Sequence, residues 1–511
     1  MRTRKWIGSW CSAASFALAA SSALAAQRAS FDSNRWWPSQ FRGGIAQSKY
    51  FEGFVDLGVD GSLEIVTSAF STPRVPGTHV EVGLNDGSGH YAGRVLSPFP
   101  SNAPWLMWVG SDLGDLNCDG LTDFLLRGWY QNLAPIRLYA HVGDGSGSLI
   151  ATGAVTFAPE PTWDWLHPSE YLVLVADLNG DGADDVMVGK ADASVAVYRN
   201  DGAGHFQELA GALVDTQAGD NRARLADLDR DSDLDLVTSH GSIFWNRGDG
   251  HFLPGPRVRG GRYSVAAGDL DGDGWADLVF GSNSIRPILF LNDRMGGFVD
   301  ESARITPVSS TAVVQRDAVQ IVDVNGDGRM DINFFSRAVP WATELYVQDA
   351  AGQFADGKAR VGLAGAPPEL VTCYADMDRD GDVDAVLYPF LNTPGRVYPN
   401  LHRQIMTNDP HIGGQLDVDL FAPVGHLVNF ALSLGRLDAN VPPFGWWALD
   451  PSTTAIWPTG ALVPSSGSVQ VSMPVPNQAA LVGLRLFAQG IDIDLASSSV
   501  RLMNFWPITI R

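Results

Sequence analysis

A ten-residue acidic pattern occurs seven times in the chain and restricts its possible folds more than any other feature. The third copy, residues 177–186, reads Asp-Leu-Asn-Gly-Asp-Gly-Ala-Asp-Asp-Val. Acidic or amide side chains occupy positions 1, 3 and 5, Gly occupies position 6, and an acid occupies position 9. Successive copies begin about 53 residues apart on average. A period near 50 residues predicts a solenoid, an array or a propeller.

The side chains of this pattern suit a hard divalent cation. Such a cation takes about six to eight oxygen ligands, which come from carboxylates, amides and backbone carbonyls. Gly at position 6 allows the positive φ that curls the chain, so alternate side chains converge on one point. The acid at position 9 comes from the start of the next element and closes the cage. Each copy therefore predicts a calcium-binding loop, numbered here from loop 1 to loop 7.

The candidate Ca²⁺ ligands occupy equivalent positions in the seven loops. They are Asp56, Asp60 and Glu64 (loop 1); Asp115, Asn117, Asp119 and Asp123 (loop 2); Asp177, Asn179, Asp181 and Asp185 (loop 3); Asp227, Asp229, Asp231 and Asp235 (loop 4); Asp269, Asp271, Asp273 and Asp277 (loop 5); Asp323, Asn325, Asp327 and Asp331 (loop 6); and Asp376, Asp378, Asp380 and Asp384 (loop 7).

The loops differ in how well they match the pattern. Loop 4 has Ser232 where Gly is expected, and loop 1 has Gly58 at position 3, so it lacks one side-chain oxygen. We therefore expect five to seven Ca²⁺ sites, and ordinary hairpin turns are the alternative, mainly for loop 1. An EF-hand is excluded because it needs flanking helices and an acid at position 12.

The distribution of charge supports local cation sites. The chain has a formal net charge of −22, and 27 of its 57 acidic residues lie in the seven loops. No basic stripe is present that could neutralise phosphates, so a nucleic-acid partner is disfavoured.

The N-terminus predicts export. Arg2, Arg4 and Lys5 precede an apolar run over residues 6–20, and small residues allow cleavage near residue 25 or 26. Residues 1–26 therefore read as a signal peptide of a secreted, extracytoplasmic protein. No later run is long enough for a transmembrane segment. Of the remaining cysteines, Cys118 and Cys373, we expect two buried thiols without a disulfide.

Each repeat also predicts four short strands. In the third repeat, apolar runs over residues 171–176, 186–189, 195–198 and from residue 205 onward are separated by Gly, Asn and Asp. Such runs are typical of strands, and four of them form one antiparallel sheet. The seventh repeat lacks its last strand, whereas Phe31 stands upstream of the first repeat without one of its own. We expect the segment around residues 29–34 to supply the missing outer strand.

These motifs resemble FG-GAP/VCBS repeats. The loops of the form Asp-x-Asn/Asp-x-Asp-Gly-x-x-Asp are followed by Gly-x-Gly-x-Phe, as in the integrin α-chain head and many secreted bacterial proteins. The resemblance implies an all-β fold in which residues 27–405 form a seven-bladed β-propeller. It also implies that the loops join the first two strands of each blade on one face of the disc, and that ligands bind the opposite face.

The last part of the chain, residues 406–511, predicts a small C-terminal β-sandwich. It contains no acidic loop, and Pro and Gly separate its apolar runs. The expected strands are residues 415–421, 427–434, 469–475, 481–488, 491–495 and 500–510.

Function is less tightly constrained. No hydrolase or phosphate-binding motif occurs, and His90, His205 and His251 share one repeat position that suits a structural role. We expect a non-enzymatic, monomeric binding or adhesion module whose partner is a glycan or an extracellular protein. The alternatives are a glycan-active enzyme of the polysaccharide-lyase kind, with His167 and Tyr130 as candidates, and a structural spacer. Tryptophans expected on the ligand face can stack on sugars or anchor a protein. They are Trp105, Trp108, Trp129, Trp163, Trp165 and Trp341.

Overall fold

The computed structural model describes most of the chain from residue 37 onward. The described residues are 37–42, 49–69, 79–85, 87, 91–98, 106–130, 137–151, 155–158, 172–190, 195–214, 222–282, 284, 286–308, 316, 318–336, 342–358, 371–388, 394–400, 404–408, 410–441 and 444–511. Over these ranges the protein is all-β, and its helical content is limited to the short 3-10 turns η1 (Ser302–Arg304) and η3 (Ala479–Leu481). The predicted signal peptide lies outside the described residues.

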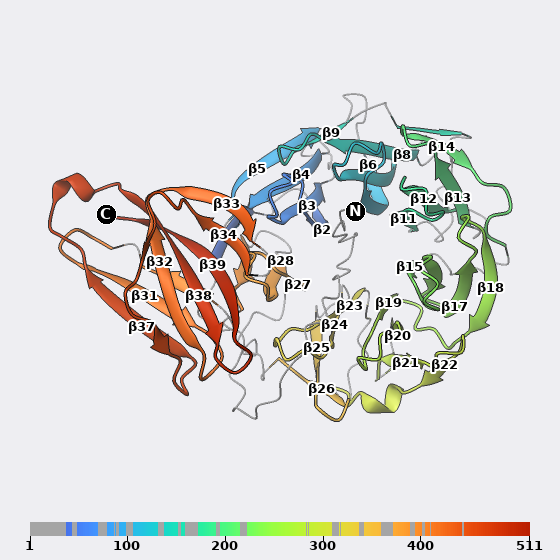
Figure 1. Cartoon of the computed structure of the whole chain (residues 1–511). Coiled ribbons are helices and arrows are strands. Elements are labelled where there is room, and N and C mark those ends of the chain that lie inside the picture. The colour runs from blue at the N-terminus through green and yellow to red at the C-terminus, as the bar shows by residue number, and fades with distance from the viewer. Residues whose placement is uncertain are drawn as a thin grey trace.

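Seven small antiparallel sheets can be followed through the described residues up to residue 400 (Figure 1). Sheet 1 contains β2 (Lys49–Val55), β3 (Glu64–Ala69), β4 (His79–Asn85) and β5 (Tyr91–Pro98). Sheet 2 contains β6 (Leu106–Gly114), β7 (Asp123–Tyr130), β8 (Arg137–Gly143) and β9 (Leu149–Ala151). Sheet 3 contains β11 (Val173–Ala176), β12 (Asp185–Gly189), β13 (Val195–Asn200) and β14 (His205–Glu208), to which β10 (Thr156–Ala158) is added. Sheets 4 to 6 are formed by β15 (Ala223–Ala226), β16 (Asp235–Thr238), β17 (Ser242–Asn246) and β18 (Phe252–Arg257); by β19 (Ser264–Gly268), β20 (Asp277–Gly281), β21 (Ile288–Asn292) and β22 (Phe298–Asp300); and by β23 (Ala318–Val322), β24 (Asp331–Ser336), β25 (Ala342–Gln348) and β26 (Phe354–Asp356). Sheet 7 contains β27 (Val371–Ala375), β28 (Asp384–Tyr388), β29 (Pro394–Tyr398) and β1 (Trp37–Arg42).

The predicted arrangement of four antiparallel strands in each repeat is confirmed. Apart from the added strands β1 in sheet 7 and β10 in sheet 3, strands follow one another in chain order within each sheet, and each acidic loop connects the first strand of its repeat to the second. Along each repeat, short apolar runs alternate with groups of turn residues, so the strands are short and the loops are tight. All seven loops therefore occupy the same place in their sheets.

Hydrophobic clusters join each sheet to the next. Between sheets 4 and 5, for example, Val237 packs with Val265 and Leu278. Equivalent clusters lie between all the remaining pairs of consecutive sheets, from sheets 1 and 2 to sheets 6 and 7. The cluster that contains Phe54 and Met377 joins sheet 1 to sheet 7. The arrangement is consistent with a β-propeller, in which each sheet buries both faces against its neighbours.

The N-terminal strand completes sheet 7, although not with the residues expected. β1 pairs antiparallel with β29, with Trp37 opposite Val397. The predicted segment, residues 29–34, precedes this strand and lies outside the described residues. Phe31 was placed by analogy with the aromatic residue of the other repeats. Strand pairing instead depends on backbone hydrogen bonds, and within the described part of the chain the outer strand of sheet 7 is formed by residues 37–42.

The outer edges of three sheets are covered by the chain that leaves the preceding sheet. β10 pairs in parallel with β14, and single parallel bridges join Leu213 to Phe252 and Ile305 to Phe354. An uncovered edge strand presents unpaired N–H and C=O groups that can recruit another chain. In these three sheets the connecting segment occupies that position.

The C-terminal part of the chain forms two further antiparallel sheets and a hairpin. The strands are β30 (Gln404–Thr407), β31 (Gln415–Phe421) and β37 (Ser468–Pro474) in one sheet; β32 (Leu427–Ser433), β35 (Ala455–Ile456), β36 (Ala461–Leu462), β38 (Arg485–Asp494) and β39 (Ser499–Thr509) in the other; and β33 (Arg436–Val441) with β34 (Gly445–Leu449) in the hairpin. The two sheets share one core, in which Val418 and Leu420 pack with Phe430 and Met503. We call residues 404–511 the C-terminal domain; β30 thus spans the predicted boundary at residue 405.

One prediction for this domain was wrong, and one element was missed. Residues 481–488 and 491–495 do not form separate strands, because β38 runs continuously from Arg485 to Asp494. Gly490 suggested a break, but it lies at a register shift opposite β39, and an added Cβ would be 2.3 Å from the Met503 Sδ. Gly inside a strand often marks such a bulge. The hairpin of β33 and β34 was not predicted at all.

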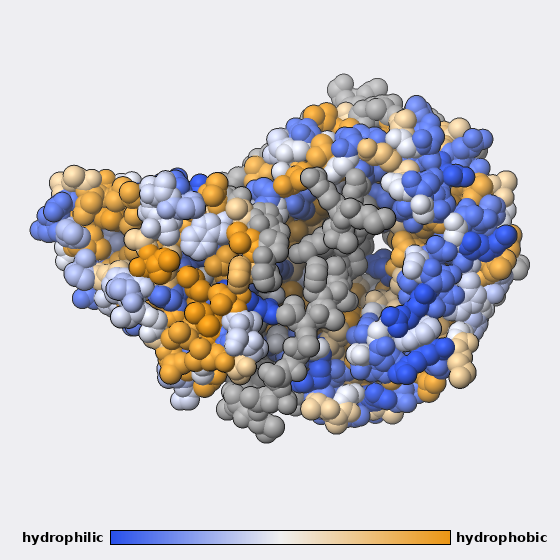
Figure 2. Space-filling view, in the orientation of Figure 1, coloured by the Kyte–Doolittle hydropathy of each residue, from blue (hydrophilic) through white to orange (hydrophobic). Residues whose placement is uncertain are grey.

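The surfaces of the two parts differ. In the view of Figure 2, hydrophobic residues gather over the C-terminal domain, whereas hydrophilic residues predominate on the visible surface of the ring of sheets. The C-terminal domain exposes Leu434, Leu437, Phe444 and Ile456 to between 41% and 60%. Over the described residues, no helix has the length and apolar character needed to cross a membrane.

Candidate metal centres

The backbone of the seven loops takes the same curled conformation. At position 6 the six glycines and Ser232 all have positive φ, as predicted, and Ser232 has a φ of 77°. Position 4 also has positive φ in every loop, which the pattern did not suggest. Gly fills position 4 in three loops, but Val59, Cys118, Arg230 and Arg379 fill it in the others. Non-Gly residues in this conformation cost about 1 kcal/mol or more each, so the surrounding contacts must enforce it.

Side chains at positions 1, 3 and 5 accept hydrogen bonds from the loop's own backbone. In loop 5, Asp269 accepts from the N–H groups of Asp273 and Gly274, at 3.0 and 2.9 Å. Asp273 in turn accepts from the Trp275 N–H at 2.8 Å, and Asp271 accepts from the Asp273 N–H at 3.2 Å. These local bonds hold three carboxylates on the inner side of one turn, as Asx turns do. In the other loops, the side chains at positions 1 and 5 accept equivalent hydrogen bonds from backbone N–H groups.

The acid at position 9 fastens the loop to the third strand. Asp277 is 1% exposed, and its two oxygens accept from the Leu270 N–H at 2.9 Å and the Asn292 N–H at 2.8 Å. The same pair of bonds recurs at positions 9 of loops 2, 3, 4, 6 and 7. We expected this residue only to close the cage of ligands. The geometry shows that it also links three parts of its sheet.

Burial and crowding make these acids unfavourable as bare anions. The pKa of Asp277 is raised to about 7, mainly by burial; the backbone hydrogen bonds oppose this rise, and the nearby Asp271 and Asp273 carboxylates contribute to it. Burial likewise raises the pKa of Glu64, Asp123 and Asp235 to about 7. A bound dication supplies the opposite charge that favours the ionised form.

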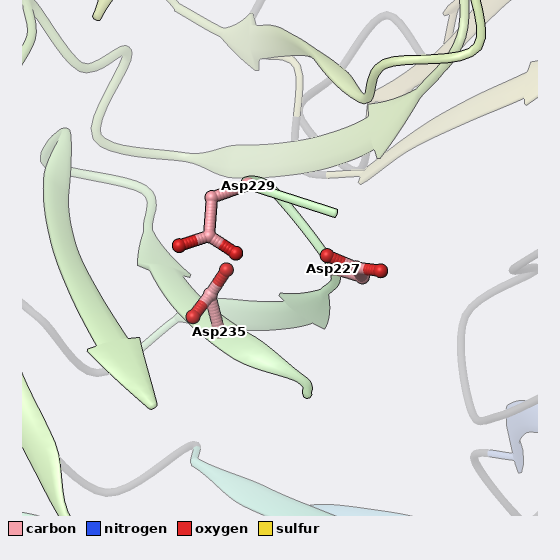
Figure 3. A group of neighbouring side chains, drawn as sticks. All are labelled: Asp227, Asp229 and Asp235. Carbon is pink, nitrogen blue, oxygen red and sulfur yellow. The ribbon is translucent and has the colours of Figure 1, made fainter. Parts of the chain in front are cut away.

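Three loops bring acidic oxygens close enough together to hold a metal ion. In each, one oxygen from every member lies within 4.8 Å of the others. The sets of acids, among the residues described, are Asp227, Asp229 and Asp235; Asp269, Asp271 and Asp273; and Asp376, Asp378 and Asp384. Figure 3 shows the first set, with the Asp229 and Asp235 carboxylates pointing toward one another and Asp227 beside them. Loops 2, 3 and 6 carry Asn at position 3, whose amide oxygen is also a suitable ligand.

Loop 7 differs from the others because its acids are buried. Asp378 and Asp380 are 1% and 4% exposed, whereas the position-5 acids of loops 1 to 4 are exposed. The Asp378 Oδ1 and Asp380 Oδ2 atoms are buried without a hydrogen-bond partner. Leaving a buried acceptor unsatisfied costs about 1–3 kcal/mol, and more for a charged group. Oxygens that point inward and lack donors fit a bound cation.

A row of buried amides connects six of the seven loops to the following sheet, and the sequence analysis missed it. Asn292, at the end of β21, donates to the carbonyl of Leu228 in loop 4 at 2.8 Å and to the carbonyl of Ala276 in its own sheet at 3.2 Å. The same role is filled across five other interfaces by Asn85, Asn200, Asn246, Gln348 and Asn400. Sheet 2 has Gly143 at this position. An Asn that recurs directly before the Gly-rich turn was the available signal.

The remaining predicted residues are placed as follows. Cys118 and Cys373 form no disulfide, as expected, but Cys118 is exposed and Cys373 is half-buried. Cys118 occupies position 4, where the left-handed turn directs the side chain outward. Trp108 and Trp129 lie at the ends of β6 and β7 remote from loop 2. Trp105, Trp163, Trp165 and Trp341 lie outside the described residues.

Four adjacent segments of the chain match the family model described as FG-GAP-like repeat. They are residues 115–188, 177–238, 239–280 and 269–334. Residues 115–334 carry FG-GAP-like repeats. The FG-GAP-like segments begin at the first residue of loop 2 and include loops 2 to 6, whereas loops 1 and 7 lie outside them.

Other comparisons add little. No curated protein matches the chain. The crystal structure of BBS1N in complex with ARL6DN, soaked with lead, is 9% identical, with a TM-score of 0.39 over 71% of this chain and 97% of that one. Trypsin-activated alpha-2-macroglobulin from Escherichia coli is 10% identical, with a TM-score of 0.15 over 95% of this chain and 42% of that one. Neither similarity is high enough to support an argument about function.

Proposed function

We propose that the chain is an exported, calcium-binding β-propeller of seven blades that acts as a non-enzymatic binding module. The observation that carries the proposal is the repetition of one loop geometry at the same place in all seven sheets. Each loop holds its acidic side chains with its own backbone, and in three described loops acidic oxygens from three residues lie within 4.8 Å of one another. A site that recurs in this way suits a role in stiffening the whole ring rather than in one local reaction.

Two further observations support the proposal that the ring is closed. β1 completes sheet 7, and the cluster around Phe54 and Met377 joins sheet 7 to sheet 1. Seven interfaces between seven sheets leave no first or last sheet in the ring. Calcium bound to the loops would stiffen the connection between the first two strands of each blade. Because position 9 also bonds to the third strand, ordering of the loop reaches most of the blade.

The proposed partner is a glycan or an extracellular protein that binds the face remote from the loops. Support comes from the register of sheet 2, which places Trp108 and Trp129 at that end of their strands. Aromatic side chains in such positions can stack on sugar rings or anchor a protein surface. Export is proposed from the N-terminal sequence, which has the charge and apolar run of a signal peptide.

Calcium titration tests the first part of this proposal. Isothermal titration of chelator-treated protein should show five to seven calcium ions per chain. Each ion present at about 100 times its Kd stabilises the native state by about 2.7 kcal/mol. The melting temperature should therefore rise strongly with calcium but not with an equal concentration of magnesium. Absence of calcium binding, or an unchanged melting temperature, would refute the proposal.

Glycan-array binding tests the second part. The wild-type chain should bind a restricted set of glycans, and Trp129→Ala should weaken binding while the calcium stoichiometry stays the same. Trp245→Ala, in the third strand of sheet 4, is the control for loss of a tryptophan elsewhere in the ring. Turnover of an acidic polysaccharide would favour the enzyme alternative, whereas absence of both binding and turnover would favour a spacer.

A further inference from the structure

We infer that the cation of loop 7 fastens the C-terminal domain to the ring, so that calcium at this one site controls how the two parts are held together. The inference rests on the proposed calcium binding and adds a separate role for one loop. It is carried by a residue outside the repeats, Gln404, and by the burial of the acids that Gln404 contacts.

Gln404 is the first residue of the C-terminal domain and points into loop 7. Its Nε2 donates to the Asp378 Oδ2 at 2.9 Å. Gln404 is 0% exposed, and its Oε1 is buried without a hydrogen-bond partner. A fully buried amide therefore has one end bonded to a candidate metal ligand and the other unsatisfied beside it.

The backbone of Gln404 is integral to the C-terminal domain. Gln404 pairs with Phe421 in the adjacent strand β31. The next residue, Ile405, exchanges two hydrogen bonds with Asn504 of β39, at 2.7 and 3.2 Å, and its side chain lies in the core of the domain. A displacement of Gln404 therefore also displaces β30, which belongs to a sheet of the C-terminal domain and contributes Ile405 to the core of that domain.

Loop 7 is also attached to sheet 1. Arg379, at position 4, donates to the Asp60 carbonyl of loop 1 at 2.7 Å. Asn85 of sheet 1 donates to the Met377 carbonyl at 2.7 Å. Loop 7 thus contacts the first sheet of the ring, the last sheet and the C-terminal domain. Figure 1 shows the C-terminal domain beside β27 and β28, which flank this loop.

Without a cation this junction is electrostatically unfavourable. Five aspartates lie within nine residues of loop 7, and Asp378 and Asp380 are buried with orphaned oxygens. Their mutual repulsion in a poorly hydrated site favours an open loop. An open loop withdraws Asp378 from Gln404. A dication reverses both effects, because it neutralises the acids and fixes Asp378 in the position that Gln404 contacts.

The two parts are also joined by an apolar contact. Trp506 of β39 packs against the cluster that joins sheets 7 and 1, and it also contacts the core of its own domain. Trp506 provides an anchor that does not depend on metal. We therefore expect calcium removal to loosen the junction without unfolding the C-terminal domain.

Small-angle X-ray scattering on the full chain, combined with calorimetric calcium titration, tests this inference. The two matched variants are Asp378→Asn in loop 7 and Asp271→Asn in loop 5, which change the same position 3. Each should bind one calcium ion fewer than the wild-type chain. Only Asp378→Asn should increase the radius of gyration and the maximum dimension in saturating calcium.

A second variant separates the role of Gln404 from the folding of loop 7. Gln404→Leu keeps the volume and all five aspartates, and it should lower the calcium affinity of one site at least tenfold. Its scattering should match the wild type in excess calcium and should show the larger dimension at low calcium. Circular dichroism should show that both domains remain folded in every variant.

The possible results distinguish the inference from the function on which it rests. Equal scattering changes in the Asp378→Asn and Asp271→Asn variants, or none in either, would overturn the inference while calcium binding stood. Gln404→Leu with unaltered affinity and scattering would also overturn it. A wild-type chain that bound no calcium would remove both the proposed function and the inference.

Discussion

The buried amide at the end of the third strand allows a quantitative prediction that does not involve a metal. Asn292→Ala removes the donor to the carbonyls of Leu228 and Ala276, which are 2.8 and 3.2 Å away, and the acceptor for the Arg294 N–H at 2.9 Å. The backbone bond from the Asn292 N–H to Asp277 remains. Leu228 is 1% exposed, so water reaches its carbonyl only after local rearrangement.

The expected loss follows from these contacts. A buried carbonyl left without a donor costs about 1–3 kcal/mol, whereas a lost bond at the partly exposed turn costs about 0.5–1.5 kcal/mol. Since the Ala276 and Arg294 groups are only partly buried, we expect Asn292→Ala to reduce the free energy of unfolding by about 2–4 kcal/mol. Guanidinium unfolding in saturating calcium, followed by far-UV circular dichroism, measures this change from the shift in midpoint at constant slope.

Asn292→Gln provides the matched control. The equivalent residue of sheet 6 is Gln348, whose Nε2 donates to the Leu270 carbonyl at 2.7 Å. A glutamine at residue 292 should therefore restore more than half of the stability that alanine loses. A change below about 0.5 kcal/mol for Asn292→Ala, or equal losses in the two variants, would refute the reasoning, because the bridge between sheets would then contribute nothing specific.

Three further predictions concern other parts of the ring. The calcium-depleted protein should become less stable as the pH rises from about 4 to about 7, because the folded-state pKa values of acids such as Asp235 and Asp277 are raised to about 7 from 3.8 and their neutral forms favour folding. In saturating calcium the melting temperature should instead rise over this interval, since protons compete with the metal; parallel thermal melts at several pH values check both signs. Gly143→Ala should destabilise the chain by about 1–3 kcal/mol, because the added Cβ would lie 2.4 Å from the Thr122 carbonyl oxygen and overpacking has costs of this size; an unchanged unfolding midpoint would show that the backbone yields easily. Arg316→Met should cost about 3–5 kcal/mol, because Glu344 is then left buried without the guanidinium that lies 2.6 Å away. The double variant Arg316→Met, Glu344→Leu should recover much of this loss in the same unfolding assay, and a double variant no more stable than the single one would contradict the ion-pair explanation.

The regular part of the fold was predictable because one pattern fixed several properties together. Gly182 and its equivalents marked the tight turn, and the apolar runs on either side marked the paired strands. Repetition strengthened the prediction, because a weakly marked strand in one repeat could be placed by comparison with the same position in the others. The sequence therefore predicted the loops, the four-strand order and the completion of the last sheet by the N-terminus.

Features that depend on contacts between repeats were not predictable in the same way. Asn292 reads as an ordinary turn residue until its amide is seen to reach a loop 64 positions earlier. Gly490 reads as the end of a strand, but the side chain opposite it, Met503, requires a residue without a Cβ. Cys118 was expected to be buried on the basis of its residue type, whereas its place in the turn directs it to solvent. In each case the deciding partner lies far away in the sequence or in the local backbone geometry.

The unusual character of loop 7 was hidden for a similar reason. Its sequence follows the same pattern as loop 5, and nothing within the ten residues indicates that its acids are buried. The distinguishing residue is Gln404, which belongs to a different domain and follows no repeat. The candidate ligands could thus be named from the sequence, but the difference between one site and another required the tertiary structure.

The pairing of β1 with β29 has a consequence for how the protein is made. Trp37 emerges from the ribosome early, but its partner, Val397, is synthesised 360 residues later. Until then the earliest strand has no sheet to join, and the growing ring stays open with a hydrophobic face at each end. Contacts between such distant residues form slowly, and exposed strands are prone to aggregation meanwhile. Completion of sheet 7 is therefore a late step that cannot begin before β29 has been synthesised, and deletion of residues 37–42 should yield chains that associate with one another through the vacant position in sheet 7.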